Sequence, residues 1–170
     1  GEDGRVVAFD YSNIEVLVLA ELSNDHNLKE FTRSGRSMHT FNLANVLGKP
    51  YDEVNAILKD EDHPLHAEYN RRRENDMKPM EFSSNYGASA AGVAYAAGVS
   101  LEEAEAFLKK KAEAFPQVTA YHELVEDTVE SNCTSHREYA DDGTSRLYKI
   151  GRMVMPCGTT FTYRQQERTT

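Results

Sequence analysis

Cysteine and long apolar runs are scarce in this chain of 170 residues, and its 19 basic residues are outnumbered by 28 acidic ones. Its two cysteines, Cys133 and Cys157, match no metal-binding spacing, which favours free thiols in a reducing compartment. No apolar run approaches the length of a membrane span and no signal peptide is visible, so we expect no membrane partner. The net charge of -9 opposes bulk attraction to nucleic acid, so any phosphate contact must come from a local basic patch.

The length suits one domain of ordinary size, or a piece of a larger one, and it allows a substantial buried core. The chain begins with Gly1 rather than Met, directly before its most informative stretch. We therefore expect a segment of a longer protein.

That informative stretch changes from a strand pattern to a helix pattern. Residues 6–9 form a short apolar run typical of a buried strand, and the run ends at Asp10. Ser12 or Asn13 is placed to cap the helix that follows. The apolar residues on one face of this helix are Ile14, Leu17, Val18, Ala20 and Leu22. A carboxylate between a buried strand and a helix N-terminus can hold a divalent cation against a phosphate. The alternative is a surface turn in which Asp10 merely ends the strand.

A second informative stretch carries an arginine run at 71–73 and then three residues spaced four apart, Lys78, Phe82 and Tyr86. This spacing places a cation and two aromatic rings along one face of a helix. Such a face could hold a triphosphate, a sugar or base, and a neighbouring base. The alternative is that the rings belong to the core and the arginines to a solvated face. Pro79 disfavours a helix interior, so the helix either begins near Lys78 or is kinked there.

The remaining segments predict an α+β fold that is mostly helical. Further helices are predicted at 27–34, 39–47, 51–59, 88–97, 101–115 and 116–132. Ser100 and Glu103 have the spacing of a capping box at the start of one of them. Alternating segments at 137–139, 146–150 and 161–163, separated by turn residues, predict a C-terminal β-hairpin or ribbon.

Taken together, these stretches resemble family A DNA polymerases, the bacterial polymerase I type and its phage relatives. Residues 10–20, D-Y-S-N-I-E-V-L-V-L-A, resemble the family's motif A, D-Y-S-Q-I-E-L-R-x-L-A. Residues 35–40, G-R-S-M-H-T, are similar to the G-x-D-I-H-T segment that follows it. Residues 78–87, K-P-M-E-F-S-S-N-Y-G, resemble motif B on the fingers helix, K-x-x-x-F-G-x-x-Y-G. The segments at 100–104 and 115–116 resemble the stretch after motif B, so the match extends through most of the chain.

The resemblance implies a DNA-directed DNA polymerase that transfers nucleotides from dNTPs with two Mg²⁺ ions. It implies that Asp10 and Lys78 are catalytic, and that Asp10 and the carbonyl of Tyr11 are metal ligands. The substrate-binding residues that it implies are Tyr11, Ser12, Asn13, Glu15, His39, Arg71, Lys78 and Phe82.

Several of these residues have distinct implied roles. Glu15 would fill the space that a 2′-hydroxyl of the incoming sugar needs. His39 and Lys78 would contact the triphosphate, and Phe82 would lie against the sugar and base. Tyr86 and the adjacent glycine, Gly87, would sit where the template base turns into the site.

The resemblance also implies an architecture and partners. It assigns residues 1–35 to the palm, 36–134 to the fingers, and 135–170 to a hairpin or ribbon that returns toward the palm. The partners that it implies are primer-template DNA, dNTP and the rest of a polymerase chain. The expected location is the cytoplasm of a bacterium or of a phage-infected cell.

Some features depart from the family pattern. The family has an arginine four residues before the motif B lysine, where this chain has Glu74. Arg71 lies seven residues before Lys78, on nearly the same face of a regular helix, whereas Arg73 faces elsewhere. We therefore predict Arg71 as the substrate-binding arginine, while the irregularity at Pro79 leaves the choice open.

Motif C, which supplies the second catalytic carboxylate, is expected beyond residue 170, so we expect this chain alone to be inactive.

Two other interpretations are possible. One is a catalytically dead nucleotide- or nucleic-acid-binding module of the same fold, which Glu74, Leu17 and the net charge of -9 favour. The other is a purely structural helical domain, which leaves the residues of motifs A and B without an explanation.

Overall fold

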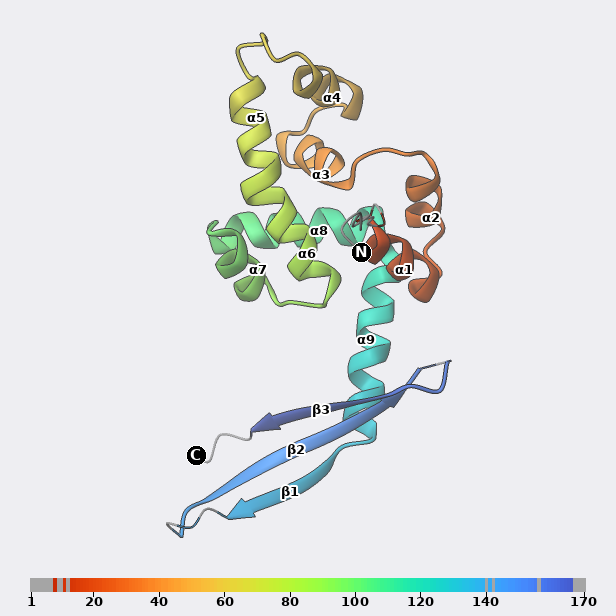
Figure 1. The fold of residues 1–170 in the computed structure, drawn as a ribbon, viewed down its shortest axis with the longest axis vertical. Helices are drawn as coiled ribbons and strands as arrows, with labels where there is room; N and C mark the ends of the chain where they lie inside the picture. The colour runs from red at the N-terminus through yellow and green to blue at the C-terminus, as the bar shows by residue number, and fades with distance from the viewer. Residues whose placement is uncertain are drawn as a thin grey trace, which may run out of the picture. The chain divides into compact units, whose positions relative to one another are not determined.

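The computed structural model describes Ala8, Tyr11 and residues 13–139, 141, 143–155 and 157–166. Its helices are α1 (Ile14–Ser23), α2 (His26–Arg33), α3 (Met38–Leu47), α4 (Tyr51–Lys59), α5 (His66–Arg72), the π-helical turn η1 (Arg73–Met77), α6 (Lys78–Asn85), α7 (Ala90–Ala97), α8 (Leu101–Ala114) and α9 (Pro116–Ser131) (Figure 1). Its strands are β1 (Thr134–Tyr139), β2 (Ser145–Val154) and β3 (Thr160–Gln166). The predicted α+β, mostly helical fold is confirmed.

The chain forms two compact units, residues 1–119 and 120–170. The boundary falls within α9 and does not coincide with the subdomain limits at 35 and 134 that the family resemblance implies. The predicted limits separate polymerase subdomains, whereas the observed boundary separates compact units. The predicted limits therefore stay a prediction. Of the strand predicted at 6–10, only Ala8 is described, and Asp10 lies outside the described residues.

Short-range signals begin and end many of the helices. The side chains of four cap residues each accept a hydrogen bond from the backbone N–H three residues further on: Asp25, Ser37, Ser89 and Ser100. Glu103 completes the predicted capping box by bonding the Ser100 N–H at 3.0 Å. Gly48 and Gly98 end α3 and α7 in the left-handed conformation, which glycine adopts without strain. Local sequence therefore determines these boundaries.

Of the apolar face predicted for α1, only Ala20 is buried. The other four residues, Ile14, Leu17, Val18 and Leu22, are exposed, whereas the buried positions are Val16, Leu19, Ala20 and Ser23. Apolar residues surround this helix on several sides, so periodicity alone does not identify the side that packs. Asn13 is the N-cap, but its backbone is left-handed and its side chain makes no capping bond. The other predicted cap, Ser12, lies outside the described residues.

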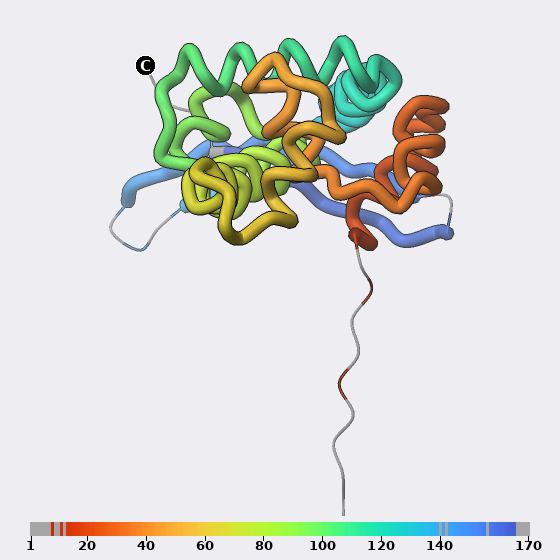
Figure 2. The backbone as a smooth tube through the Cα atoms, turned by 90° about the horizontal axis from the view of Figure 1, so that it is seen from above, coloured from red at the N-terminus to blue at the C-terminus, as the bar shows by residue number. Residues whose placement is uncertain are grey.

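The core of the first unit lies between α3, α4, α5, η1, α6, α7 and α8. Its most deeply buried members include Leu43, Val54, Met80, Val93 and Phe107. Figure 2 shows α8 running along one side of this unit, where it contacts α3 and α7. Three phenylalanine rings, Phe31, Phe41 and Phe115, pack with centroids 4.9 to 6.2 Å apart and tie α2 and α3 to the end of α8. Helix α6, which carries the predicted motif B, is thus held on a packed helical base.

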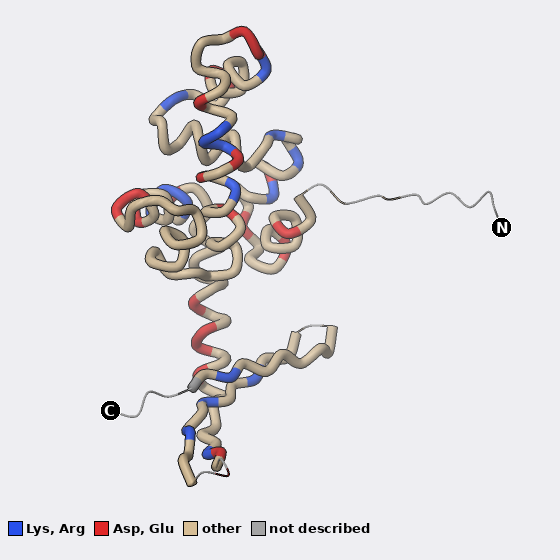
Figure 3. Tube along the Cα trace, turned by 60° about the vertical axis from the view of Figure 1, so that its left-hand side comes forward, with Lys and Arg blue, Asp and Glu red and all other residues tan. Residues whose placement is uncertain are grey.

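The second unit contains a three-stranded antiparallel sheet in the order β1-β2-β3. The predicted hairpin or ribbon is therefore a meander, and its strands are longer than the alternating segments indicate. Gly151 on β2 lies close against Val129 of α9, where a side chain would not fit. In this unit acidic residues recur along α9, while lysine and arginine residues occur along the strands (Figure 3). Basic charge is thus concentrated locally in an acidic chain.

Candidate functional site

The helix that carries the predicted motif B, α6, is preceded by an irregular turn. η1 continues α5 without a break and leads into α6, whose first residue is Lys78. The Lys78 N–H bonds the carbonyl oxygen of Arg73, five residues earlier, as in a π-helix. Pro79 follows immediately and has no N–H to donate, so the irregular turn ends where the proline begins the regular helix. The regular segment α6 therefore begins at Lys78, as one of the two predictions had it, while the helical backbone itself continues into α6 from α5 through the irregular turn.

Lys78, Phe82 and Tyr86 share one exposed face of α6, which we call the motif B face. Their exposed fractions are 60%, 54% and 68%, respectively. The two rings are in contact, with centroids 5.2 Å apart and planes inclined at 51°. The alternative that these aromatic residues belong to the core is therefore wrong. Gly87 follows with a φ of 75°, a left-handed conformation in which a side chain would be strained.

Motif A and motif B meet at one polar contact. The Tyr86 hydroxyl lies 3.4 Å from Oε1 of Glu15, within hydrogen-bond distance. Glu15 is on the first turn of α1, which packs beside α6. The two residues are 71 positions apart in sequence. The fold thus brings together the two motifs that the sequence analysis singled out.

His39 lies on α3 and is half-buried beside η1 and α6. Burial lowers the pKa of its imidazole from the ordinary value of 6.5. Glu81 and Glu74 raise this pKa, whereas Arg73 and Lys78 lower it further. Among the described residues, its buried Nδ1 atom has no hydrogen-bond partner. The net lowering favours a neutral His39 at neutral pH, near the cations of η1 and α6.

The charged residues before Lys78 form two separate groups. Arg71 and Arg72 both approach Asp76, with Arg71 Nη1 3.7 Å from Oδ1 and Arg72 Nε 3.7 Å from Oδ2. In the other group, the Glu74 carboxylate pairs with Lys78 Nζ at 3.6 Å and with the guanidinium of Arg73. Arg71, the predicted substrate-binding arginine, is therefore paired with Asp76 in this structure, and its role stays a prediction.

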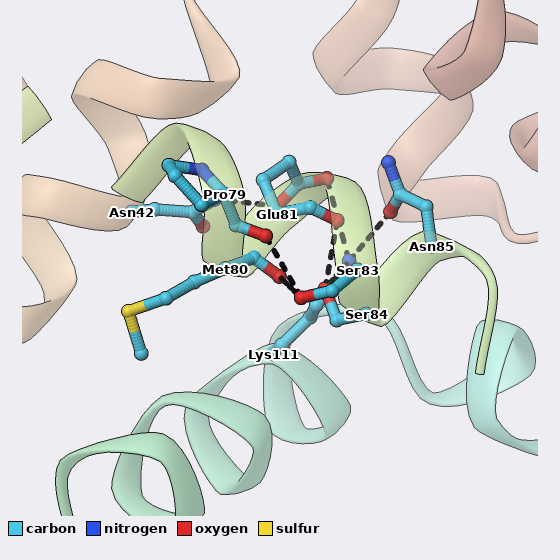
Figure 4. A network of polar contacts seen from close by, with 8 residues as sticks. All are labelled: Asn42, Pro79, Met80, Glu81, Ser83, Ser84, Asn85 and Lys111. Atoms are coloured by element: carbon cyan, nitrogen blue, oxygen red, sulfur yellow. Dashed lines mark hydrogen bonds and ion pairs between the residues drawn. The ribbon is translucent and has the colours of Figure 1, made fainter. Parts of the chain in front are cut away.

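A buried polar network behind the motif B face was missed by sequence reasoning (Figure 4). Glu81 is 2% exposed and lies 3.3 Å from Lys111 Nζ on α8, while Asn42 on α3 donates to its other oxygen at 2.5 Å. Lys111 also donates to Ser84 at 2.7 Å and to Asn85 at 2.6 Å. Burial lowers the pKa of Lys111 more than Glu81 raises it. The network fixes α6 to both neighbouring helices.

One sequence signal could have identified this network. Glu81 falls at helical spacing among Met77, Met80 and Ser84, which form the buried face of η1 and α6. Lys111 likewise follows Ala104 and Phe107 on the buried face of α8. A charged residue on an apolar face requires a buried partner of opposite charge. The pairing itself depends on how the helices pack.

The predicted metal ligands are only partly described. Asp10 lies outside the described residues, and Tyr11 is exposed. Within the described ranges, no group of three or more His, Cys, Asp or Glu side chains could hold a metal ion. The donor set for the predicted Mg²⁺ ions therefore still rests on the resemblance to motif A.

Comparison with known proteins identifies the family. The family model described as DNA polymerase family A matches residues 1–140. The thermostable DNA polymerase I of Thermus filiformis is 32% identical over 157 residues, which are 88% of this chain and 17% of that protein. The DNA polymerase I of Bacillus subtilis is 29% identical over 157 residues, 88% of this chain and 16% of that protein. The chain belongs to DNA polymerase family A.

A solved structure supports the same assignment. The chain is similar to the POL domain of Pol1 from M. smegmatis, in complex with DNA primer-template and dNTP, with a TM-score of 0.50 and 31% identity. The similarity covers 74% of this chain and 20% of that one. This chain thus spans less than a fifth of the length of the curated relatives described above. None of the helices in the described part combines the length and apolar character that a membrane crossing requires.

Proposed function

We propose that this chain forms the incoming-nucleotide site of a DNA-directed DNA polymerase, with dNTP and primer-template DNA as its substrates. The observation that carries the proposal is the contact between Glu15 and Tyr86. It joins the start of α1 to the motif B face, so the elements that would surround a nucleotide lie side by side. The family assignment and the similarity to a polymerase domain solved with primer-template and dNTP support this function.

The proposed roles follow from charge and exposure. Lys78 is an exposed cation that binds the triphosphate as a point charge and supplies a proton to the leaving pyrophosphate. Phe82 offers an exposed ring to the sugar and base, and Tyr86 continues that surface toward the template. Glu15 lies under the sugar, where its contact with Tyr86 holds its carboxylate in place. His39 contacts the triphosphate from α3.

Asp10 and the Tyr11 carbonyl are the proposed ligands of Mg²⁺, which stabilises negative charge on the attacking and leaving oxygens when it is bound. The rest of a polymerase chain is a proposed partner. The exposed apolar side of α1, with Ile14, Leu17 and Val18, supports this because such a surface is commonly covered by another part of a protein. The proposed location is the cytoplasm of a bacterial or phage-infected cell.

The first test measures the binding of a dNTP to this chain by calorimetry, with and without Mg²⁺. We expect Lys78→Ala to weaken binding by about tenfold, because a charge-assisted contact to phosphate is lost. Lys109→Ala is the matched control, since Lys109 is an exposed lysine on α8. Equal affinities of the wild type and Lys78→Ala would exclude the triphosphate from the motif B face.

A catalytically dead binding module is the second candidate. The observation in its favour is the carboxylate of Glu74, which pairs with Lys78 at the position where the family has an arginine. Both candidates bind nucleotide, so the discriminating measurement is Mg²⁺-dependent primer extension by the complete gene product. For a polymerase we expect extension that Asp10→Asn abolishes while dNTP binding persists. Absence of extension with intact dNTP binding would favour the dead module.

A further inference from the structure

The π-helical turn changes which arginine stands next to Lys78. In a regular α-helix a residue five positions earlier points about 140° away from its successor. Here the Lys78 N–H bonds the Arg73 carbonyl, so these five residues span slightly more than one turn of a wider helix. Arg73 therefore lies one turn before Lys78, on the same side of the helix. The irregular turn has the effect of inserting one residue into the fingers helix.

Glu74 lies between these two cations. Its carboxylate pairs with the guanidinium of Arg73 and lies 3.6 Å from Lys78 Nζ. The side chains of Lys78, Glu74 and Arg73 are 60%, 39% and 28% exposed, respectively, so an incoming anion could reach both cations. His39 interacts electrostatically with the same three residues. Two cations thus flank one accessible carboxylate.

Arg71 and Arg72 are held in a different arrangement. Both approach Asp76 rather than Glu74. The side chain of Asp76 is 18% exposed, against 39% for Glu74, so the carboxylate that Arg71 and Arg72 share is the less accessible one, although the Arg71 side chain itself is 58% exposed. The three consecutive arginines therefore divide into two that pair with Asp76 and one that lies beside Lys78.

We propose that Arg73 is the second phosphate-binding cation of this chain, and that Glu74 is an internal anion which the nucleotide's polyphosphate displaces. The proposal rests on the proposed function of the motif B face. A polyphosphate carries several charges and acceptor oxygens and can bind Arg73 and Lys78 together, whereas the single carboxylate of Glu74 is held by exposed pairs that water and salt weaken. Arg73 thus takes the role predicted for Arg71, because the π-turn shifts the helical register.

The test measures the binding of inorganic tripolyphosphate, with Mg²⁺, to this chain by calorimetry and by NMR shifts of the arginine Nε–H groups. We expect Arg73→Ala to weaken binding by about tenfold, and Arg71→Ala, its matched control, by less than about twofold. Arg73→Lys keeps the charge without the planar fork and is expected to recover part of the loss. Thermal unfolding of each variant verifies that the helices remain folded.

A second pair of matched variants tests the role of Glu74. Glu74→Gln removes the competing charge and is expected to tighten tripolyphosphate binding by about threefold to tenfold. Glu68→Gln removes an equal charge from an exposed position on α5 and is expected to change binding by less than about twofold. Weaker binding by Glu74→Gln, or equal tightening by both variants, would contradict a role of Glu74 as the displaced anion.

The outcomes separate this inference from the proposed function. If Lys78→Ala weakens binding but Arg73→Ala does not, the nucleotide site stands and the role of Arg73 is wrong. A larger loss for Arg71→Ala than for Arg73→Ala would restore the prediction made from regular helical spacing. Absence of binding to the wild type at millimolar tripolyphosphate and dNTP would overturn both.

Discussion

Lys111 Nζ lies 3.3 Å from Oε1 of Glu81, and both side chains are more than nine-tenths buried. This pair connects α8 to α6, the helix that carries the motif B face. Asn42 adds a hydrogen bond to Glu81 from α3, the helix that carries His39. The motif B face is on the opposite side of α6, so its orientation depends on this buried contact.

Glu81→Gln is expected to lower the free energy of unfolding by about 3 kcal/mol, because it leaves the Lys111 cation buried without its counter-charge. Urea-induced unfolding measures this. The double variant Glu81→Leu with Lys111→Met removes both charges and is expected to cost less than the single variant, since replacing a buried pair by apolar groups is often neutral. If the double variant is the less stable of the two, the pair contributes net stability by itself.

Asp25 is expected to be one of the most sensitive positions of the first unit. Its carboxylate accepts from the Leu28 N–H and from the Gln117 N–H, each at 2.9 Å, and so caps both α2 and α9. Asp25→Ala removes two caps from a fully buried position, and we expect a loss of about 2–4 kcal/mol in urea unfolding. Ser89→Ala, which removes one cap at the start of α7, is expected to cost about 1 kcal/mol or less. Equal costs would show that the second cap contributes nothing.

Sequence reasoning succeeds where a feature depends on residues close together in the sequence, and fails where it depends on how distant segments pack. The capping box of Ser100 and Glu103 depends on neighbours within a few residues and is present as predicted. Most of the apolar face predicted for α1 is exposed because apolar residues occur on several sides of that helix. Glu81 and Lys111 pair across 30 positions, so only the packed helices bring them together. The π-turn is also invisible to a periodicity that assumes one helix type.

His39 is expected to make stability depend on pH in a defined direction. Burial lowers the pKa of the folded imidazole below the value of 6.5 that we assume for the unfolded chain. Between these two values the unfolded chain binds a proton that the folded chain does not. Stability that is present above about pH 6.5 is therefore lost as the pH falls through this window, and the loss ends below the folded pKa.

The measurement is urea unfolding at a series of pH values, compared with His39→Gln. We expect the acid-side loss of stability to be smaller in this variant. His26→Gln is the control, because His26 is exposed on α2 and its replacement leaves the buried imidazole of His39 in place. An identical pH dependence of the wild type and His39→Gln would show that other groups cause the loss.

A substitution at Gly151 on β2 tests how closely the sheet packs on α9 within the second unit. A Cβ at this position would lie 2.5 Å from Cγ1 and 2.7 Å from the carbonyl oxygen of Val129, and 3.0 Å from the sulfur of Cys133. Because a backbone atom is involved, rotation of the Val129 side chain cannot remove the whole clash. We expect Gly151→Ala to destabilise the second unit by about 1–3 kcal/mol, seen as faster amide hydrogen exchange along β2.

Arg152→Ala, at the next and exposed position of the same strand, is expected to leave that exchange nearly unchanged. Adding Val129→Ala to Gly151→Ala removes Cγ1 but not the carbonyl oxygen, so we expect it to restore only part of the protection. Full restoration would show that the side chain, rather than the helix backbone, limits the approach of the sheet.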